Sequence, residues 1–409
     1  MARQNVGVRL GKWLLNRIKI FYKEVDKPIY ILSHLLMMIG ILMVYTASSY
    51  KAISEGDAAT AYMFRQLVFV VIGLGLIFFL GQMNIAIFRR KKWMYGLLLA
   101  MVLAMALVWT IGPTINGAKG WLRIGSFSIQ PIEFAKPIVV VVLANLLGLH
   151  QEELVSGNLW SVIKSESKVS IALVLILGIT FFLPDFGGMA IVASIIALMI
   201  LASGAPAKWF KRSLLGVGVG YVIMLIILHF FDFSHIDNYQ IRRFTAFANP
   251  FAYAQGDGLQ LVNSYYAFAL GGLMGQGPGN SIQKTGYIPE AHNDFIMAII
   301  GEEFGFFVTL LIIAIYFALI IYLLMKSTKM RTIFLQLILV GVAGYFFVQI
   351  FINLGGVLGL IPITGVTLPF LSYGGSSVLA SSIMIGLALA AIRRDQRERQ
   401  EPTNIKDYQ

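Results

Sequence analysis

The chain has 409 residues, of which 58% are hydrophobic and only 13% are charged. Soluble domains are about 45–50% apolar and about 25% charged, so this composition excludes an ordinary soluble enzyme. The same hydrophobicity excludes a disordered chain. Because the sequence has no cysteine, disulfides and cysteine-based metal or catalytic sites are also excluded.

Long apolar runs predict an all-α integral membrane protein. About 20 apolar residues cross the hydrocarbon layer, and the sequence offers about ten runs that are candidate transmembrane helices. They lie at about 29–47, 67–88, 93–112, 131–149, 169–183, 189–203, 213–231, 297–325, 332–354 and 376–392. The fifth and sixth runs are short and joined by Pro184-Asp185-Phe186-Gly187-Gly188, which predicts either two spans or one re-entrant hairpin.

Basic residues indicate the orientation. Most of the 32 Lys and Arg residues lie before the first run, after the last run, or in alternate connections such as 89–92. By the positive-inside rule, both termini are predicted to be cytoplasmic. The net charge of +12 is therefore interpreted as a topology signal and not as a nucleic-acid-binding surface. The first run lacks a cleavage site and is expected to stay as an anchor.

These observations predict three regions. Residues 1–28 are expected to form a cytoplasmic amphipathic segment, with a frayed basic tail as the alternative. Residues 29–392 form the membrane domain, and residues 393–409 form a cytoplasmic tail. Between the seventh and eighth runs, 232–296 is a large extracytoplasmic loop, and so long a connection in a tightly looped bundle indicates function.

The end of this loop carries the strongest catalytic candidate. Asp294 lies at the mouth of the eighth run, close to Glu290 and His292, and is therefore a candidate general base. The alternative is structural, because Asn293 or Asp294 before an apolar run is also a typical helix cap. The glycine-rich stretch 271–280 cannot be a regular helix, and it is either an anion-binding nest or a set of turns.

Four acidic or basic side chains other than histidine lie within the apolar runs, namely three Glu and one Lys. Glu133 and Lys136 are spaced i, i+3, so they share one helix face and can form an ion pair. A substrate contact is the alternative for this pair. Glu302 and Glu303 follow in the eighth run, where charges are costly and mark either function or a buried pair.

Two further features lie on the outer side. Lys119 and Arg123 are cations that oppose the topology bias, which favours contact with an anion. The stretch 353–377 is apolar but interrupted by Gly and Pro, and it predicts a re-entrant segment buried in protein. Ser376 and Ser377 are candidate caps for the tenth run.

Several ordered motifs carry a family resemblance. They are NGAKGWLRIGSFSIQPIEFAKP at 116–137, PDFGG at 184–188, RRFTAF at 242–247, GNSIQKTGYIPEAHNDFI at 279–296, GEEFGF at 301–306 and PITGVTLPFLSYGGSS at 362–377. On these motifs the chain resembles the SEDS family of bacterial cell-wall polymerases (FtsW, RodA, SpoVE) over nearly its whole length. GNSIQK followed by GYIPEAH is more similar to the division-type FtsW than to the elongation-type RodA. The chain departs from the family pattern at Asn293, where Thr is common, and at PDFGG, where PDxGT is usual.

The resemblance implies a peptidoglycan glycosyltransferase that polymerises lipid II and releases undecaprenyl diphosphate, with Asp294 as the general base. The candidate substrate-binding residues are Lys119, Arg123, Glu133, Lys136, Arg242, Arg243, Lys284, Glu290, His292 and Ser376. No residue is assigned as a metal ligand, although Mg²⁺ or Mn²⁺ is compatible with a diphosphate leaving group.

The resemblance also implies partners and a location. The expected partner is a class B penicillin-binding protein, together with other divisome proteins, at the division septum of the bacterial cytoplasmic membrane. The alternatives are a lipid II flippase, which broken spans and intramembrane charges would also suit, an elongation-type RodA-like polymerase, and a non-catalytic divisome scaffold.

Overall fold

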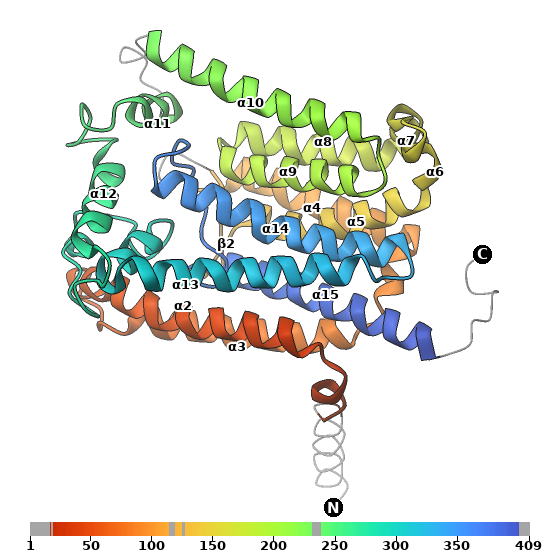
Figure 1. Ribbon diagram of the computed structural model, residues 1–409, viewed down its shortest axis with the longest axis horizontal. Coiled ribbons are helices and arrows are strands. Elements are labelled where there is room, and N and C mark those ends of the chain that lie inside the picture. The colour runs from red at the N-terminus through yellow and green to blue at the C-terminus, as the bar shows by residue number, and fades with distance from the viewer. Residues whose placement is uncertain (1–16, 18, 114–118, 125–126, 231–238, 401–409) are drawn as a thin grey trace, which may run out of the picture.

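The computed structural model describes residues 17, 19–113, 119–124, 127–230 and 239–400. Long helices lie side by side in one bundle, and the only sheet in these residues is a two-stranded hairpin (Figure 1). The elements are α2 (Lys27–Ser54), α3 (Ala61–Gln82), η1 (Ile85–Arg89), α4 (Lys91–Ile111), β1 (Leu122–Ile124), β2 (Phe127–Ile129), α5 (Pro131–Leu149), α6 (Gln151–Val155), α7 (Leu159–Ser165), α8 (Ser167–Phe182), α9 (Phe186–Ala202), α10 (Ala207–Phe230), α11 (Tyr239–Ala248), α12 (Leu259–Gly271), η2 (Gln283–Thr285), α13 (Ile296–Ser327), α14 (Ile333–Val357) and α15 (Gly375–Gln400).

Each predicted apolar run corresponds to a helix, so the prediction of a multi-pass all-α membrane protein is confirmed. Among the described residues, eight helices are long and apolar enough to cross a membrane by themselves. A ninth span results if α7 and α8, bent by 96°, are counted as one. The α9 helix has 17 residues, or about 26 Å at 1.5 Å per residue, which is short for a hydrocarbon layer of about 30 Å.

Small residues bring the helices close together. A Cβ atom at Gly73 of α3 would lie 2.4 Å from Ser382 Oγ of α15, and one at Gly386 of α15 would lie 2.8 Å from Leu80 Cβ of α3. Such close approach is typical of membrane helices, because van der Waals contact drives their association where lipid removes the hydrophobic effect.

The bundle has two different ends. The end with the connections α3–α4, α5–α8, α9–α10 and α13–α14 carries the basic clusters, and we call it the basic end (right in Figure 1). It also holds the start of α2 and the end of α15, as the Lys326–Asp26 and Arg393–Glu24 ion pairs show. The opposite end holds α11, α12, the hairpin and the segment 358–374, and we call it the site end.

The α15 helix continues beyond the apolar run to Gln400, so the first part of the predicted tail 393–409 is helical. Arg393 is only 8% exposed and pairs with Glu24 at 2.6 Å. Asp395 accepts a hydrogen bond from the Arg331 amide at 2.8 Å. These contacts hold the helix beyond the apolar run. The amphipathic segment predicted for 1–28 falls mostly on residues 1–16 and 18, outside the described part of the chain, as does 401–409 of the tail.

The long connection between α10 and α13 is folded against a break in α13. Gly305 has φ 76° and ψ −174°, so the helical hydrogen bonds are interrupted there. The freed carbonyls of Glu302 and Glu303 accept the amides of Gln276 and Gly277, each at 2.9 Å. The glycine-rich stretch is therefore irregular, as predicted. It is not an anion nest at these two amides, because both are already bonded to α13.

The segment 358–374 turns back into the bundle, which confirms the predicted re-entrant segment. A Cβ at Gly40, in the middle of α2, would lie 2.0 Å from the carbonyl oxygen of Phe370. The Tyr316 hydroxyl of α13 donates to the Pro369 carbonyl, and Gln66 of α3 donates to the Ser372 carbonyl at 3.1 Å. The backbone around 366–372 is thus buried in protein and bonded by side chains from several helices, whereas Leu358 and Leu360 at the start of the segment are exposed.

Candidate functional site

Asp294 lies at the site end, between the long connection and α13. It is 8% exposed, and its Oδ1 has no hydrogen-bond partner. The α13 helix begins at Ile296 with Phe295 at the N-cap position and no side-chain capping bond. The capping alternative for Asp294 is therefore wrong, and its carboxylate is left for another role.

Arg243 of α11 lies beside this carboxylate. Gly365 has no side chain, and the space beside it adjoins both charged groups. A Cβ atom at this position would lie 3.8 Å from Arg243 Nη1 and 3.9 Å from Asp294 Oδ2. Arg243 is held there because Nη1 donates to the Ile363 carbonyl at 3.1 Å. Both residues thus flank the start of the re-entrant segment.

The surroundings of Asp294 suit a proton acceptor that works near neutral pH. Burial, and to a smaller extent the neighbouring Glu290 carboxylate, raise the pKa of the Asp294 carboxyl to about 7, even though Arg243 and a backbone hydrogen bond oppose the shift. A general base is most effective when its pKa lies near the working pH.

Glu290 and His292 line the same loop but differ in environment. Asn293 Nδ2 donates to Glu290 Oε2, and Lys51 Nζ lies 3.9 Å from Glu290 Oε1. His292 is 2% exposed and packs against the rings of Tyr62 and Tyr373, with centroids 4.8 Å and 5.6 Å away. Burial and the Lys51 charge lower the pKa of His292 to about 3, so its imidazole is neutral and is not a cation for a diphosphate.

Lys284, Glu302 and Glu303 anchor the loop. Lys284 Nζ lies 2.6 Å from Glu303 Oε1, and both side chains are buried. Glu302 accepts hydrogen bonds from Ser281 Oγ at 2.5 Å and from the Ile282 amide at 2.8 Å. The two glutamates are therefore explained as buried, paired groups that fix the loop preceding Asp294.

A pocket of about 250 Å³ opens between this loop and α2, and we call it the Tyr50 pocket. One wall comes from α2, whose Ala47, Tyr50, Lys51 and Ser54 follow helical spacing and so share one face. The other wall is the loop from Lys284 to His292. It contains three of the predicted site residues, Lys284, Glu290 and His292.

The substrate-contact interpretation of Lys136 is not supported by its burial. Lys136 is fully buried, with Nζ 2.5 Å from Glu133 Oε1 and 3.2 Å from Gln349 Oε1. Glu133 is 6% exposed. The predicted ion pair is present, and the packing of α5 against α14 closes it off from substrate.

The remaining predicted cations are at the site end but apart from Asp294. Arg242 is half exposed and lies 3.5 Å from Asp257, and Lys119 and Arg123 are exposed near the β1–β2 hairpin. Ser376 Oγ accepts a hydrogen bond from the Gln130 amide at 2.9 Å. Ser376 therefore links the end of the hairpin to α15, and its hydroxyl does not cap α15. Within the described residues, no hydrogen bond or ion pair joins Lys119, Arg123 or Ser376 to Asp294.

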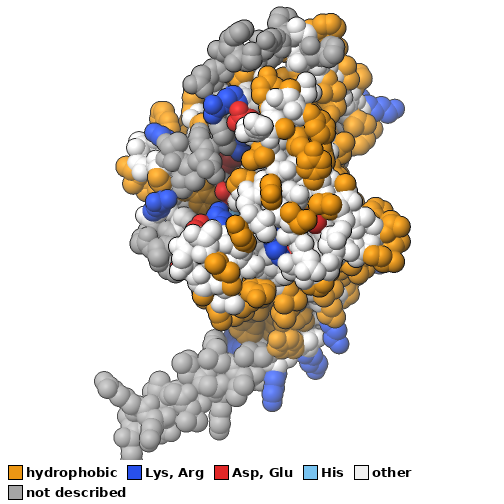
Figure 2. Space-filling view, turned by 90° about the vertical axis from the view of Figure 1, so that its left-hand side faces the viewer, with side chains coloured by type: hydrophobic (Ala, Val, Ile, Leu, Met, Phe, Trp, Pro, Cys, Tyr) orange, Lys and Arg blue, Asp and Glu red, His pale blue; other side chains and the backbone are white. Residues whose placement is uncertain are grey.

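Figure 2 shows the site end with acidic and basic side chains gathered near the middle, and hydrophobic side chains mainly along its flanks. Within the described chain, no group of three or more His, Asp or Glu residues could hold a metal ion. Several charges of this face are paired, among them Arg65 with Asp57 and Arg242 with Asp257.

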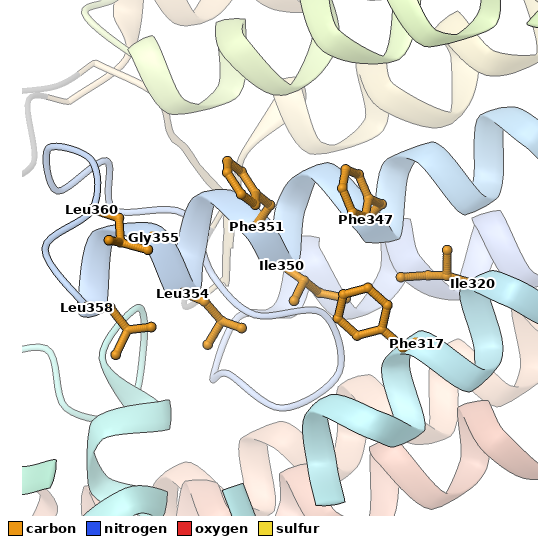
Figure 3. A pocket seen from close by; sticks show the side chains of 9 residues that line it. All are labelled: Phe317, Ile320, Phe347, Ile350, Phe351, Leu354, Gly355, Leu358 and Leu360. Carbon is orange, nitrogen blue, oxygen red and sulfur yellow. The ribbon is translucent and has the colours of Figure 1, made fainter. Parts of the chain in front are cut away.

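An apolar groove lies elsewhere, between α13 and α14 (Figure 3). It encloses about 100 Å³ and is lined by Phe317, Ile320, Phe347, Ile350, Phe351, Leu354, Gly355, Leu358 and Leu360. None of these lining residues is ionisable, and none of them belongs to the polar site around Asp294.

Sequence reasoning missed Asn353, which contacts Asp294 directly. Asn353 is 3% exposed, and its Nδ2 donates to the carbonyls of Asp294 and Val366, each at 2.7 Å. One feature of the sequence could have indicated it: Asn353 is a lone amide side chain at the end of the ninth apolar run, where a polar side chain needs a hydrogen-bond partner.

Comparison with known proteins agrees with this architecture. The model of the FtsW/RodA/SpoVE family, described as cell cycle proteins, matches residues 27–398. The chain belongs to this family. It is 35% identical to the probable peptidoglycan glycosyltransferase FtsW of Bacillus subtilis (strain 168), covering 94% of this chain and 96% of that protein. It is 33% identical to stage V sporulation protein E of the same organism, covering 90% and 97%.

Two solved structures share the fold of this family member. A chain from "Structural coordination of polymerization and crosslinking by a peptidoglycan synthase complex" has a TM-score of 0.69 and 24% identity, covering 91% of this chain and 98% of its own. RodA of Thermus thermophilus has a TM-score of 0.63 and 23% identity, covering 92% and 98%.

Proposed function

We propose that the chain is a peptidoglycan glycosyltransferase that polymerises lipid II into glycan strands at the outer face of the bacterial cytoplasmic membrane. The observation that carries this proposal is the Asp294 carboxylate, which is buried at the bundle mouth with an unbonded oxygen and a guanidinium nearby. The names of the FtsW relatives support the same reaction.

The residues fit the steps of this transfer. The 4-hydroxyl of the acceptor sugar attacks the anomeric carbon of the lipid-linked donor, and a new C–O bond joins the two sugars. The bond between the anomeric carbon and the phosphate oxygen breaks, and its electron pair leaves with undecaprenyl diphosphate. Asp294 accepts the proton of the attacking hydroxyl. Arg243, with Arg242 on the same helix, attracts the departing diphosphate.

The orientation follows from charge. The basic end is cytoplasmic, together with both termini, and the site end faces outward. A carboxylate at this boundary reaches a sugar hydroxyl while the prenyl chain stays in the bilayer. A divalent cation, if used, would be held by the substrate diphosphate together with at most one or two protein carboxylates, since the described residues contain no group of three candidate ligands.

The proposed setting is the division septum, with a class B penicillin-binding protein as partner to crosslink the strands and with other divisome proteins. The similarity to FtsW relatives favours division over elongation. The fold match to a chain from a peptidoglycan synthase complex supports work in an assembly.

The test is polymerisation of lipid II by the purified chain with its penicillin-binding partner, followed as glycan ladders. Asp294→Asn should lower the rate about 10²–10⁴-fold, since an amide accepts no proton. Asp57→Asn is the matched control, because Asp57 is exposed in the α2–α3 loop and pairs only with Arg65. Transbilayer movement of lipid II in vesicles without glycan synthesis would instead support the flippase alternative.

A further inference from the structure

The Tyr50 pocket is open to the site end and has no excess of positive charge. Its lining includes Lys51 and two carboxylates, Glu55 and Glu290, together with Lys284, whose ammonium group is already paired with the buried Glu303. His292 adds a neutral imidazole. Nothing in this lining would select a diphosphate.

The pocket offers both donors and acceptors of hydrogen bonds. Lys51 Nζ and Glu290 Oε1 are 3.9 Å apart, which is far enough for one hydroxyl group to bond to both. The exposed phenol of Tyr50 and the hydroxyl of Ser54 add further polar groups. Such a set matches a ligand rich in hydroxyls and without net charge.

An aromatic face completes this set. The Tyr50 ring lies 3.9 Å from the position of a Cβ at Gly286, whose φ of +111° favours glycine. The loop thus passes the ring edge without a side chain in between, and Tyr50 is 47% exposed. A flat apolar face beside charged groups is suited to the C–H face of a sugar ring.

The pocket and the base belong to consecutive parts of one loop. Glu290 and His292 line the pocket, and Asp294 follows His292 by two residues; the amides of Asn293 and Phe295 both donate to the Glu290 carbonyl, which folds this stretch into a tight turn. Arg243 does not line the pocket, and it approaches Asp294 from α11 beside Gly365 of the re-entrant segment. The base therefore has a guanidinium as one neighbour and the pocket-lining loop as another.

We propose that the Tyr50 pocket binds the acceptor saccharide, whose hydroxyl Asp294 deprotonates, while the donor diphosphate lies on the Arg243 side. This inference rests on the proposed glycosyltransferase function and adds which substrate sits on which side of the base. The attacking hydroxyl belongs to the acceptor, so the acceptor ring must adjoin the base. The leaving diphosphate belongs to the donor and needs cations.

The experiment introduces a bulky side chain at the edge of the Tyr50 pocket. Ser54→Phe places a ring on the pocket face of α2, and Ile53→Phe places the same ring on the next residue, which is 63% exposed and does not line the pocket. Both are measured in the full chain with its partner. The donor is a lipid-linked glycan whose 4-hydroxyl is blocked by an added sugar, so that it only donates. The acceptor is a lipid II analogue in which a methylene group replaces the anomeric oxygen, so that it has no leaving group and only accepts.

Ser54→Phe should raise the KM for the acceptor about tenfold, the size of one lost hydrogen bond in a fitted site, and change the KM for the blocked donor little. Ile53→Phe should leave both constants unchanged. Equal acceptor constants in the two variants, or a rise in the donor constant alone, would overturn the assignment. If Ser54→Phe lowers the melting temperature, Tyr50→Ala with the same two readouts decides. Failure of the wild-type chain to make any glycan would instead reject the underlying function.

Discussion

The Asn353 side chain holds the main chain of Asp294: its Nδ2 lies 2.7 Å from the Asp294 carbonyl oxygen and 2.7 Å from that of Val366. One amide of α14 thus joins the loop before α13 to the re-entrant segment. Asp294 and Gly365 are kept together by a group that touches neither the carboxylate nor Arg243. Asn353 is therefore a positioning residue.

Asn353→Ala should lower kcat for lipid II polymerisation more than tenfold while changing KM little, because the base is displaced from the attacking hydroxyl. Two buried carbonyls would lose their donor, at a cost of about 1–3 kcal/mol each. Gln66→Ala is the control, because Gln66 also donates a buried amide to this segment, at Ser372, without contacting Asp294. Equal loss of kcat in both variants would reduce Asn353 to a general structural role.

The orientation can be tested with single cysteines, since the natural chain has none. Gln255 and Lys329 are both exposed and lie at opposite ends of the bundle. A membrane-impermeant thiol reagent added to intact cells should label Gln255→Cys and spare Lys329→Cys until the membrane is opened. The reverse labelling pattern would place Asp294 on the cytoplasmic side, where it could not act on exported lipid II.

The bundle was predictable because eight of its described helices are apolar runs long enough to cross a membrane. The ends of the helices could not be predicted in this way, because hydropathy does not detect a helix that continues into polar residues. The α15 helix passes the apolar boundary at 392 and reaches Gln400 because Arg393 and Asp395 find partners on the N-terminal segment and the α13–α14 loop. Partners distant in the sequence determine that boundary.

The site, too, could be predicted where its residues are close in sequence and not where they meet only in the folded chain. Asp294, Glu290 and His292 are close in sequence, so their grouping could be predicted. The approach of Arg243 to Asp294 depends on how α11 and the re-entrant segment fold together. Lys136 was a candidate substrate contact because the sequence of a span does not indicate which of its faces packs against another helix. Asn353 was not selected because its position resembles an ordinary helix end.

The Glu133–Lys136 pair should act through stability and not through substrate. Lys136→Ala would leave the Glu133 carboxylate buried without its partner, at a cost of about 3–5 kcal/mol. We expect reduced accumulation of folded protein and a lower melting temperature. The double variant Glu133→Gln, Lys136→Met should recover much of both, together with polymerisation. A double variant that folds fully but makes no glycan would restore the substrate-contact hypothesis.

The pH dependence of polymerisation should report on Asp294. The carboxyl must be ionised to accept a proton, and its pKa is raised to about 7, so the rate at low lipid II should fall as the pH decreases below about 7. Two charges face this carboxyl, Glu290 from its own loop and Arg243 from α11.

Removing either charge should shift the acidic limb of the pH–rate profile, which is the pH range where the rate falls, in a defined direction. Glu290→Gln removes a negative neighbour, which lowers the pKa of Asp294 and shifts the limb to lower pH. Arg243→Gln removes a positive neighbour, so it raises that pKa and shifts the limb to higher pH. The measurement is the position of the limb, not the height of the profile, since both residues also face substrate. Identical limbs in wild type and both variants would mean that another group accepts the proton.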